Sequence, residues 1–136
     1  MKKVLFSILI IAGFVILSCG EEKESINFTS LTSNIWLSDS LLANGEDASG
    51  PGEYLEKFNG IINFKKDGTG IFGEYSGNWV FAYEETKIVI SSDSLLIPLT
   101  ANIDLLNNAD LKMSAIFPNL KDPANPVALR MTFKAQ

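Results

Sequence analysis

The chain has 136 residues, no histidine, one cysteine and a formal net charge of −5. This length predicts one domain. Without histidine the chain has no Ser-His-Asp triad, Cys-His dyad or histidine metal ligand, and one cysteine forms neither an internal disulfide nor a thiolate zinc cage. An acidic chain also lacks the clustered Lys and Arg that nucleic-acid phosphates require, so we expect no nucleic-acid partner.

Residues 1–18 have the layout of a secretory signal peptide. Lys2 and Lys3 form a positive start, and the 14 residues from Val4 to Leu17 are almost entirely apolar. This stretch is short for a helix that spans a membrane, which needs about 20 apolar residues. Removal of residues 1–18 would take two lysines and no acidic residue, so the remainder carries a formal charge of −7.

The end of this segment, Ile16-Leu17-Ser18-Cys19, resembles a bacterial lipobox. The resemblance implies cleavage before Cys19 and acylation of its thiol with palmitate-like chains, hence a membrane partner reached through a lipid anchor. Two or three acyl chains anchor a protein far more strongly than one. The expected location is the outer membrane of a Gram-negative cell, on the periplasmic face or the cell surface. The alternatives are an uncleaved anchor and an ordinary signal peptide followed by a chance cysteine.

Residues 19–32 are predicted to be the lipidated cysteine and a polar tether, because they are polar and lack helical periodicity. The acidic stretch from Glu21 to Glu24 resembles a signal that some Gram-negative groups use to export lipoproteins to the cell surface. A solvated linker is the alternative interpretation.

Residues 33–136 have the pattern of an all-β domain of seven to nine short antiparallel strands. Predicted strands cover residues 34–38, 58–66, 70–75, 79–84, 87–90, 95–106, 111–115 and 128–134. Turns are expected at 67–68, 76–78, 91–94 and 107–110, and long loops at 40–57 (with one helical turn near 53–57) and 118–126. Pro98 requires an edge, a bulge or a break in its strand. Closure into a barrel would hide both edges of such a meander.

Several stretches in order resemble the lipocalin-like domains of small bacterial lipoproteins. They are Leu31 to Trp36, Ile62 to Gly70, Gly77-Asn78-Trp79 and Leu105 to Met113. The resemblance spans about residues 31–135. It implies a single antiparallel up-and-down β-barrel of about eight strands, with a long first loop over one end.

Trp36 and Arg130 are candidates for a contact that closes the barrel. Lipocalins have Gly-x-Trp in the first strand and an arginine of the last strand packed over that Trp, whereas here Asn34 stands in place of the glycine. Arg130 is the single arginine of the chain and lies in the last predicted strand. The resemblance therefore implies a Trp36–Arg130 cation–π contact worth about 0.5–2 kcal/mol. The alternative is a core Trp and an exposed Arg, because Arg130 alternates with the apolar face.

We find no pattern that predicts a catalytic residue, a cofactor or a metal site, and we expect that the protein is not an enzyme. An eight-stranded barrel is wide enough either to be filled by side chains or to hold one small ligand. The candidate residues for lining such a ligand cavity are the strand aromatics Phe64, Phe72, Trp79, Phe81, Tyr83 and Phe133. The sequence leaves a filled and an open barrel as alternatives.

Two functions therefore remain. The first is a lipid-anchored lipoprotein that binds a small apolar ligand inside its barrel, in a cavity beside Trp79. The second is an interaction, accessory or inhibitor lipoprotein with a filled barrel, which binds an envelope protein through its surface or its 40–57 loop.

Overall fold

Strands and tight turns dominate the chain, as the period-two patterns predict. The computed structural model describes residues 24–136. In chain order the elements are α1 (Ile26–Ser33), β1 (Trp36–Ala43), β2 (Glu46–Asp47), the 3-10 turn η1 (Glu56–Phe58), β3 (Ile61–Phe64), β4 (Thr69–Phe72), β5 (Tyr75–Ala82), β6 (Lys87–Ser91), β7 (Leu99–Leu106), β8 (Asp110–Phe117) and β9 (Val127–Ala135). The signal peptide of residues 1–18 and the lipidation site Cys19 lie outside the described residues.

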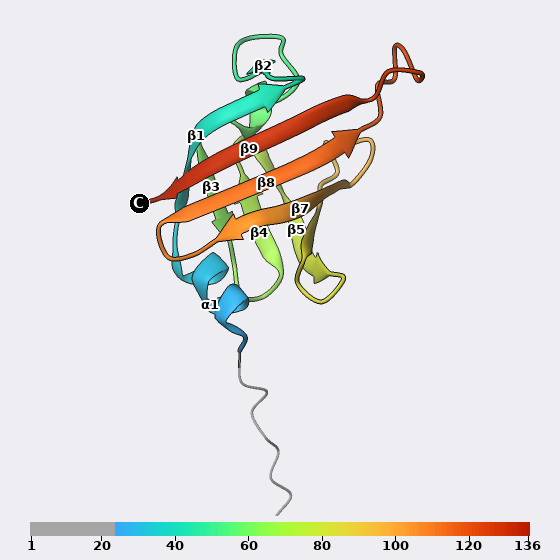
Figure 1. Ribbon diagram of the computed structural model, residues 1–136. Helices are drawn as coiled ribbons and strands as arrows, with labels where there is room; N and C mark the ends of the chain where they lie inside the picture. The colour runs from blue at the N-terminus through green and yellow to red at the C-terminus, as the bar shows by residue number, and fades with distance from the viewer. Residues whose placement is uncertain (1–23) are drawn as a thin grey trace, which may run out of the picture.

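Eight of the described strands close into an antiparallel up-and-down barrel (Figure 1), which confirms the predicted fold class. Strands β3 to β9 follow one another around the wall, and β1 pairs with β3 on one side and with β9 on the other. The β1–β9 ladder is long, from Trp36 opposite Ala135 to Ala43 opposite Leu129. Strand β2 adds only a short hairpin to β1.

Alternation along β9 shows how the sequence builds the core. Val127, Leu129, Met131 and Phe133 are buried, whereas the residues between them face outward. Because side chains of a strand point alternately to its two faces, one face of β9 fills the barrel interior and the other meets water. The same alternation in the other strands produces one continuous core.

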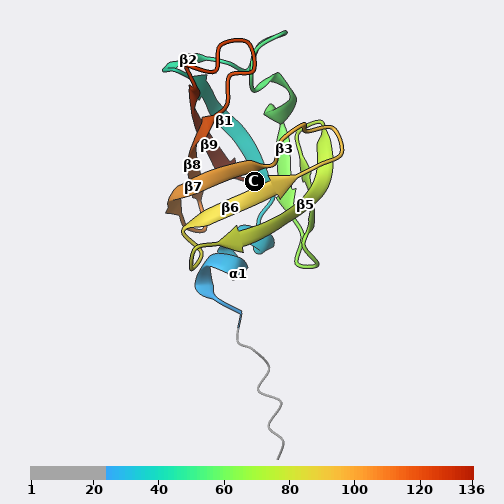
Figure 2. The same ribbon diagram turned by 90° about the vertical axis from the view of Figure 1, so that its right-hand side faces the viewer.

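The two ends of the barrel differ. In an up-and-down meander, successive connections lie at alternate ends, so the turns 65–68, 83–86 and 107–109 share one end with α1. We call this the helix end. The connections 44–60, 92–98 and 118–126 lie at the opposite end, which we call the loop end. Figures 1 and 2 show α1 beneath the barrel and the longer connections above it.

Helix α1 corrects the prediction of a polar tether as far as residue 32. Ser25 caps the helix by accepting a hydrogen bond from the Phe28 backbone N–H at 3.0 Å, which is the usual function of serine at this position. Leu31 is fully buried in the core, and the Ser30 hydroxyl donates to Asn108 Oδ1 in the β7–β8 turn at 3.2 Å. The folded part of the chain therefore begins before residue 33.

Two predicted connections also differ from the structure. Strand β1 continues to Ala43, because Asn44 and Gly45 adopt positive φ angles and turn the chain back into β2. Asn-Gly is the residue pair that such two-residue hairpins favour. Residues 76–78, predicted as a turn, lie inside β5, and the chain reverses instead at Gly73 and Glu74, with Phe72 opposite Tyr75. Gly73 has a φ of 62°.

Candidate functional site

The aromatic residues that were expected to line a ligand cavity are mostly packed against one another. The ring centroids of Phe64 and Phe72 lie 5.4 Å apart, those of Phe64 and Trp79 lie 5.5 Å apart, and those of Trp79 and Phe81 lie 5.3 Å apart. Phe28 of α1 adds a contact with Trp79 at 5.8 Å. These are the separations of interacting aromatic pairs, so the rings fill this part of the barrel with each other.

The last two aromatic candidates have different surroundings. Phe133 of β9 is fully buried, as a core residue would be. Tyr83 corrects the expectation that it lines the interior, because it is 73% exposed. It lies in the β5–β6 turn with a φ of 51°, beyond the end of β5 at Ala82. The period-two alternation therefore ends one residue before Tyr83.

Trp36 and Arg130 do not form the expected cation–π contact. Trp36 is fully buried and lies opposite Ala135 in β9, five residues from Arg130 along that strand. Five residues of extended strand span about 17 Å. Arg130 points outward and is exposed. The Trp36 indole N–H instead donates to the backbone carbonyl of Leu31 at 3.1 Å, so its partner is the last turn of α1.

An apolar cavity of about 80 Å³ lies at the loop end. Its walls are four leucines and four aromatic residues from strands and connections: Leu55, Leu95, Leu99, Leu129, Tyr54, Phe58, Tyr75 and Phe117. Phe58 and Tyr75 pack against each other with ring centroids 5.0 Å apart. We call this space the loop-end cavity.

A wider groove adjoins the loop-end cavity. It measures about 390 Å³ and runs between residues 52–54 and residues 117–121, with Tyr54 and Phe117 shared between the two spaces. Tyr54 is 52% exposed and Leu120 is 64% exposed. Large apolar side chains at the rim of an apolar cavity are typical of binding surfaces.

None of the residues that line the loop-end cavity carries a charged side chain. Burial raises the pKa of the Tyr75 phenol, so this group is neutral at physiological pH. The Lys57 ammonium lies 5.8 Å from the centroid of the Tyr75 ring, at the distance of a cation–π contact. The cavity therefore suits an uncharged, apolar occupant.

A separate, polar hollow of about 230 Å³ lies beside β1. Asp39 and Asp47 lie on its wall together with Ser49 and Asn59. The Ser49 hydroxyl and backbone N–H both donate to Asp47 Oδ1, at 2.7 Å and 3.0 Å, and these bonds lower the pKa of Asp47. Within residues 24–136, no group of three acidic, cysteine or histidine side chains is placed to hold a metal ion.

The sequence did not predict the loop-end cavity, because half of its wall comes from connections rather than from alternating strands. The 40–57 loop is rich in glycine and acidic residues. Tyr54 and Leu55 near its end, and Phe58 directly after it, are nevertheless three large apolar residues. Leu55 and Phe58 are buried. Apolar residues inside a Gly-rich loop are the signal that this loop folds back onto the barrel.

Comparison of the chain with protein-family models finds no match, and a search of the curated proteins finds no similar sequence. Among the described helices, none is both long and apolar enough to cross a bilayer.

Proposed function

We propose that this protein is a lipid-anchored, lipocalin-like lipoprotein of the Gram-negative outer membrane, attached through Cys19, that binds an envelope protein at its loop end. It acts as an interaction protein rather than as an enzyme. A single large apolar side chain of the partner enters the loop-end cavity, and the segment around that side chain lies in the adjoining groove.

The observation that carries this proposal is the size of the cavity. Pockets for small ligands commonly measure about 300–1,000 Å³, and an engineered apolar cavity that holds benzene measures about 150 Å³. At about 80 Å³, the loop-end cavity is too small for a typical free ligand. One apolar side chain delivered by a partner matches this space, and buried anchor residues of this kind dominate many protein interfaces.

The position of the cavity supports the same proposal. Strands of eight residues, tilted as in small barrels, separate the two barrel ends by about 20 Å. The described chain begins at the helix end, so an anchor at Cys19 would place the loop end away from the membrane. A partner in the aqueous envelope space then has free access to the cavity.

Site-specific photo-crosslinking in cells tests this function. A photoreactive phenylalanine analogue replaces Tyr54 in the full-length lipoprotein, and the same analogue at Val80 serves as a control. Val80 has a similar exposure of 58% but lies on the outer wall. We expect a discrete crosslinked protein from position 54 and none from position 80.

Two adjacent leucines provide the matched variants. Leu95 lines the loop-end cavity, whereas Leu96 is 88% exposed and does not line it. Leu95→Trp should fill the cavity and reduce the position-54 crosslink at least tenfold, and Leu96→Trp should leave it unchanged. An equal crosslink in both variants would contradict the proposal, as would the same product from positions 54 and 80.

A further inference from the structure

Two large apolar side chains are exposed at the helix end of the barrel. Ile26, the first residue of α1, is 85% exposed, and Tyr83 of the β5–β6 turn is 73% exposed. A hydrogen bond of 2.6 Å from the Ser25 hydroxyl to Glu85 Oε1 joins the start of the helix to this turn. The two exposed residues therefore belong to one surface, which we call the helix-end face.

The backbone of the β5–β6 turn holds Tyr83 away from the core. Tyr83, Glu84 and Glu85 have φ angles of 51°, 55° and 64°, all in the left-handed region that non-glycine residues rarely adopt. Such conformations persist only where the surrounding structure imposes them, and they are frequent at functional positions. Lys87 Nζ lies 5.5 Å from the Tyr83 ring centroid and supports the ring in its exposed position.

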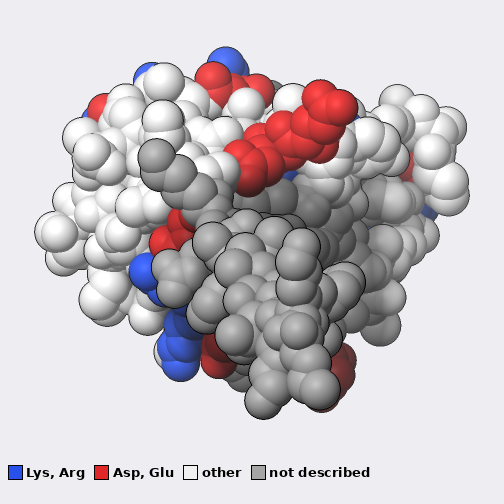
Figure 3. All heavy atoms as spheres, turned by 90° about the horizontal axis from the view of Figure 1, so that it is seen from below, with Lys and Arg blue, Asp and Glu red and all other residues white. Residues whose placement is uncertain are grey.

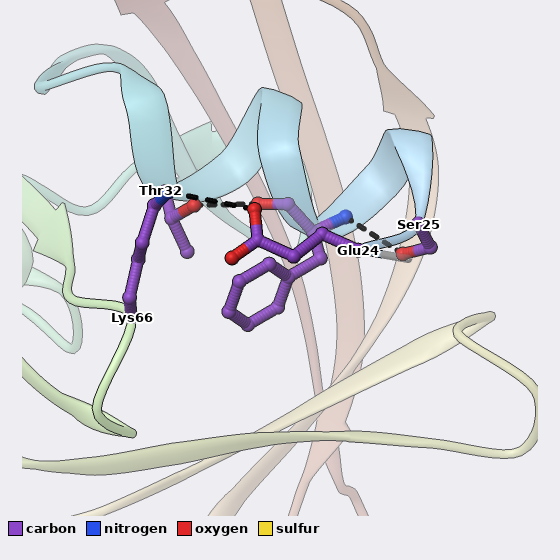
Figure 4. A network of polar contacts seen from close by, with 5 residues as sticks. Glu24, Ser25, Thr32 and Lys66 are labelled. Carbon is purple, nitrogen blue, oxygen red and sulfur yellow. Dashed lines mark hydrogen bonds and ion pairs between the residues drawn. The ribbon is translucent and has the colours of Figure 1, made fainter. Parts of the chain in front are cut away.

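Polar contacts connect the beginning of the described chain to the same end. Figure 4 shows Lys66 from the β3–β4 turn beside Glu24, with a separation of 3.4 Å between Nζ and Oε2, and Ser25 capping α1. The Thr32 hydroxyl donates to the Phe28 carbonyl at 2.7 Å within the helix. These contacts hold residues 24–26 against the barrel, so the preceding chain leaves from the helix-end face.

The length of that preceding chain limits the distance to the membrane. Cys19 lies five residues before Glu24. Even a fully extended chain of five residues spans only about 18 Å. An acylated Cys19 would therefore keep the start of α1 within about 18 Å of the lipid headgroups.

We propose that the helix-end face docks on the lipid bilayer, with Ile26 and Tyr83 inserted into the headgroup region. The inference rests on the proposed lipid anchor at Cys19 and adds a second, non-covalent contact with the membrane. Tyrosine is suited to this region because its ring is apolar and its hydroxyl remains hydrated. Docking would fix the orientation of the barrel, with the loop-end cavity directed away from the lipid.

The charges of this end indicate that apolar contact, rather than a basic patch, carries the docking. Both signs of charge occur in the turns and the helix start at this end. The basic residues are Lys65, Lys66 and Lys87, and the acidic residues are Glu24, Asp67, Glu84 and Glu85. Where the described residues are visible from this side, Figure 3 shows blue and red groups scattered among uncharged ones. Anionic lipids would therefore attract this face weakly, and docking should persist at high salt.

Lipid-depth quenching tests the proposal on the full-length protein as Gram-negative cells produce it. The protein is placed in vesicles of phosphatidylethanolamine and phosphatidylglycerol that contain a headgroup-labelled nitroxide lipid. An environment-sensitive fluorophore is attached to Lys65→Cys at the helix end or to Leu96→Cys at the loop end. We expect at least threefold stronger quenching at position 65 than at position 96.

A double variant separates docking from tethering alone. Ile26→Ser with Tyr83→Ser should reduce quenching at position 65 to the level seen at position 96. Leu96→Ser with Leu120→Ser, which removes two exposed apolar residues from the loop end, should leave quenching at position 65 unchanged. All four substitutions lie at exposed side chains, and circular dichroism verifies the fold.

Flotation of the vesicles distinguishes the two proposals. If the parent protein floats with the vesicles but positions 65 and 96 are quenched equally, the docking proposal is wrong and the lipid anchor is supported. The same conclusion follows if the Ile26/Tyr83 variant is quenched at position 65 as strongly as the parent protein. If the parent protein does not float with the vesicles, the lipid anchor is wrong and the docking inference fails with it.

Discussion

At the scale of single residues, Gly77 was predicted in a turn but lies in a strand, where the backbone of the neighbouring strand passes close to it. Gly77 lies in β5, opposite Gly70 of β4. A Cβ atom at Gly77 would lie 1.9 Å from the Ser91 carbonyl oxygen of the neighbouring strand. A glycine inside a strand commonly marks such an approach of another backbone.

Gly77→Ala should therefore lower the free energy of unfolding by about 2 kcal/mol or more, because backbone atoms must move to admit the methyl group. Gly50→Ala is the matched control, since its Cβ would meet only Glu53 Cγ at 3.9 Å. Urea unfolding of both variants measures the difference. Equal free energies of unfolding for the two variants would contradict this prediction, because they would show that β5 and β6 can move apart at Gly77 without loss of stability.

Trp36 and Arg130 supply a second prediction at the residue scale. The last carbonyls of a helix have no partner within the helix, and the Leu31 carbonyl is one of these in α1. The buried Trp36 indole N–H donates a hydrogen bond to it. Trp36→Phe should cost about 1–3 kcal/mol, because a buried acceptor loses its donor. Arg130→Lys, an exposed change, should alter neither the melting temperature nor the tryptophan fluorescence. A drop in melting temperature for Arg130→Lys would restore the cation–π hypothesis.

At the scale of elements, α1 is the part of the chain whose structure depends most on its surroundings. Its eight residues are too few for a stable isolated helix. Burial of Leu31, the ring contact between Phe28 and Trp79 and the Ser30–Asn108 hydrogen bond hold it on the barrel. The helix therefore forms because the barrel end offers these partners.

Leu31→Ala should lower the free energy of unfolding by about 2–5 kcal/mol, the usual cost of a cavity at a fully buried leucine. Ile26→Ala, in the same helix but 85% exposed, should change it by less than about 0.5 kcal/mol. Denaturant unfolding followed by tryptophan fluorescence measures both, since Trp36 and Trp79 lie next to α1. A small effect of Leu31→Ala would mean that α1 is not part of the cooperative fold.

At the scale of the whole molecule, the filled interior sets the barrel apart from one built around a ligand. The aromatic cluster of Phe64, Phe72, Trp79 and Phe81 occupies the region that a ligand cavity beside Trp79 would need. An apolar space of about 80 Å³ lies instead at the loop end. The two binding surfaces that we propose accordingly lie at the barrel ends rather than at its centre.

Dodecanoic acid should accordingly leave the melting temperature unchanged. A ligand of the native state at a hundred times its Kd would add about 2.7 kcal/mol of stability, which corresponds to a rise of several degrees in a domain of this size. Thermal unfolding with increasing dodecanoic acid, below its micelle concentration, measures the effect. A rise in melting temperature that saturates would favour the small-ligand function instead.

The sequence by itself determined the all-β class and the faces of β9, because strand alternation and turn residues are local properties. The barrel was implied by the lipocalin-like resemblance, and its closure depends on the pairing of β1 with β9. The sequence also singled out Phe64, Phe72, Trp79 and Phe133 as residues of the barrel interior. Only the tertiary structure decided the rest. Residues 26–33 become a helix through contacts with distant strands, and Gly77 lies in a strand with another backbone close beside it. The loop-end cavity forms where two connections meet the ends of four strands. Each of these features depends on atoms far apart in the chain, which no local pattern records.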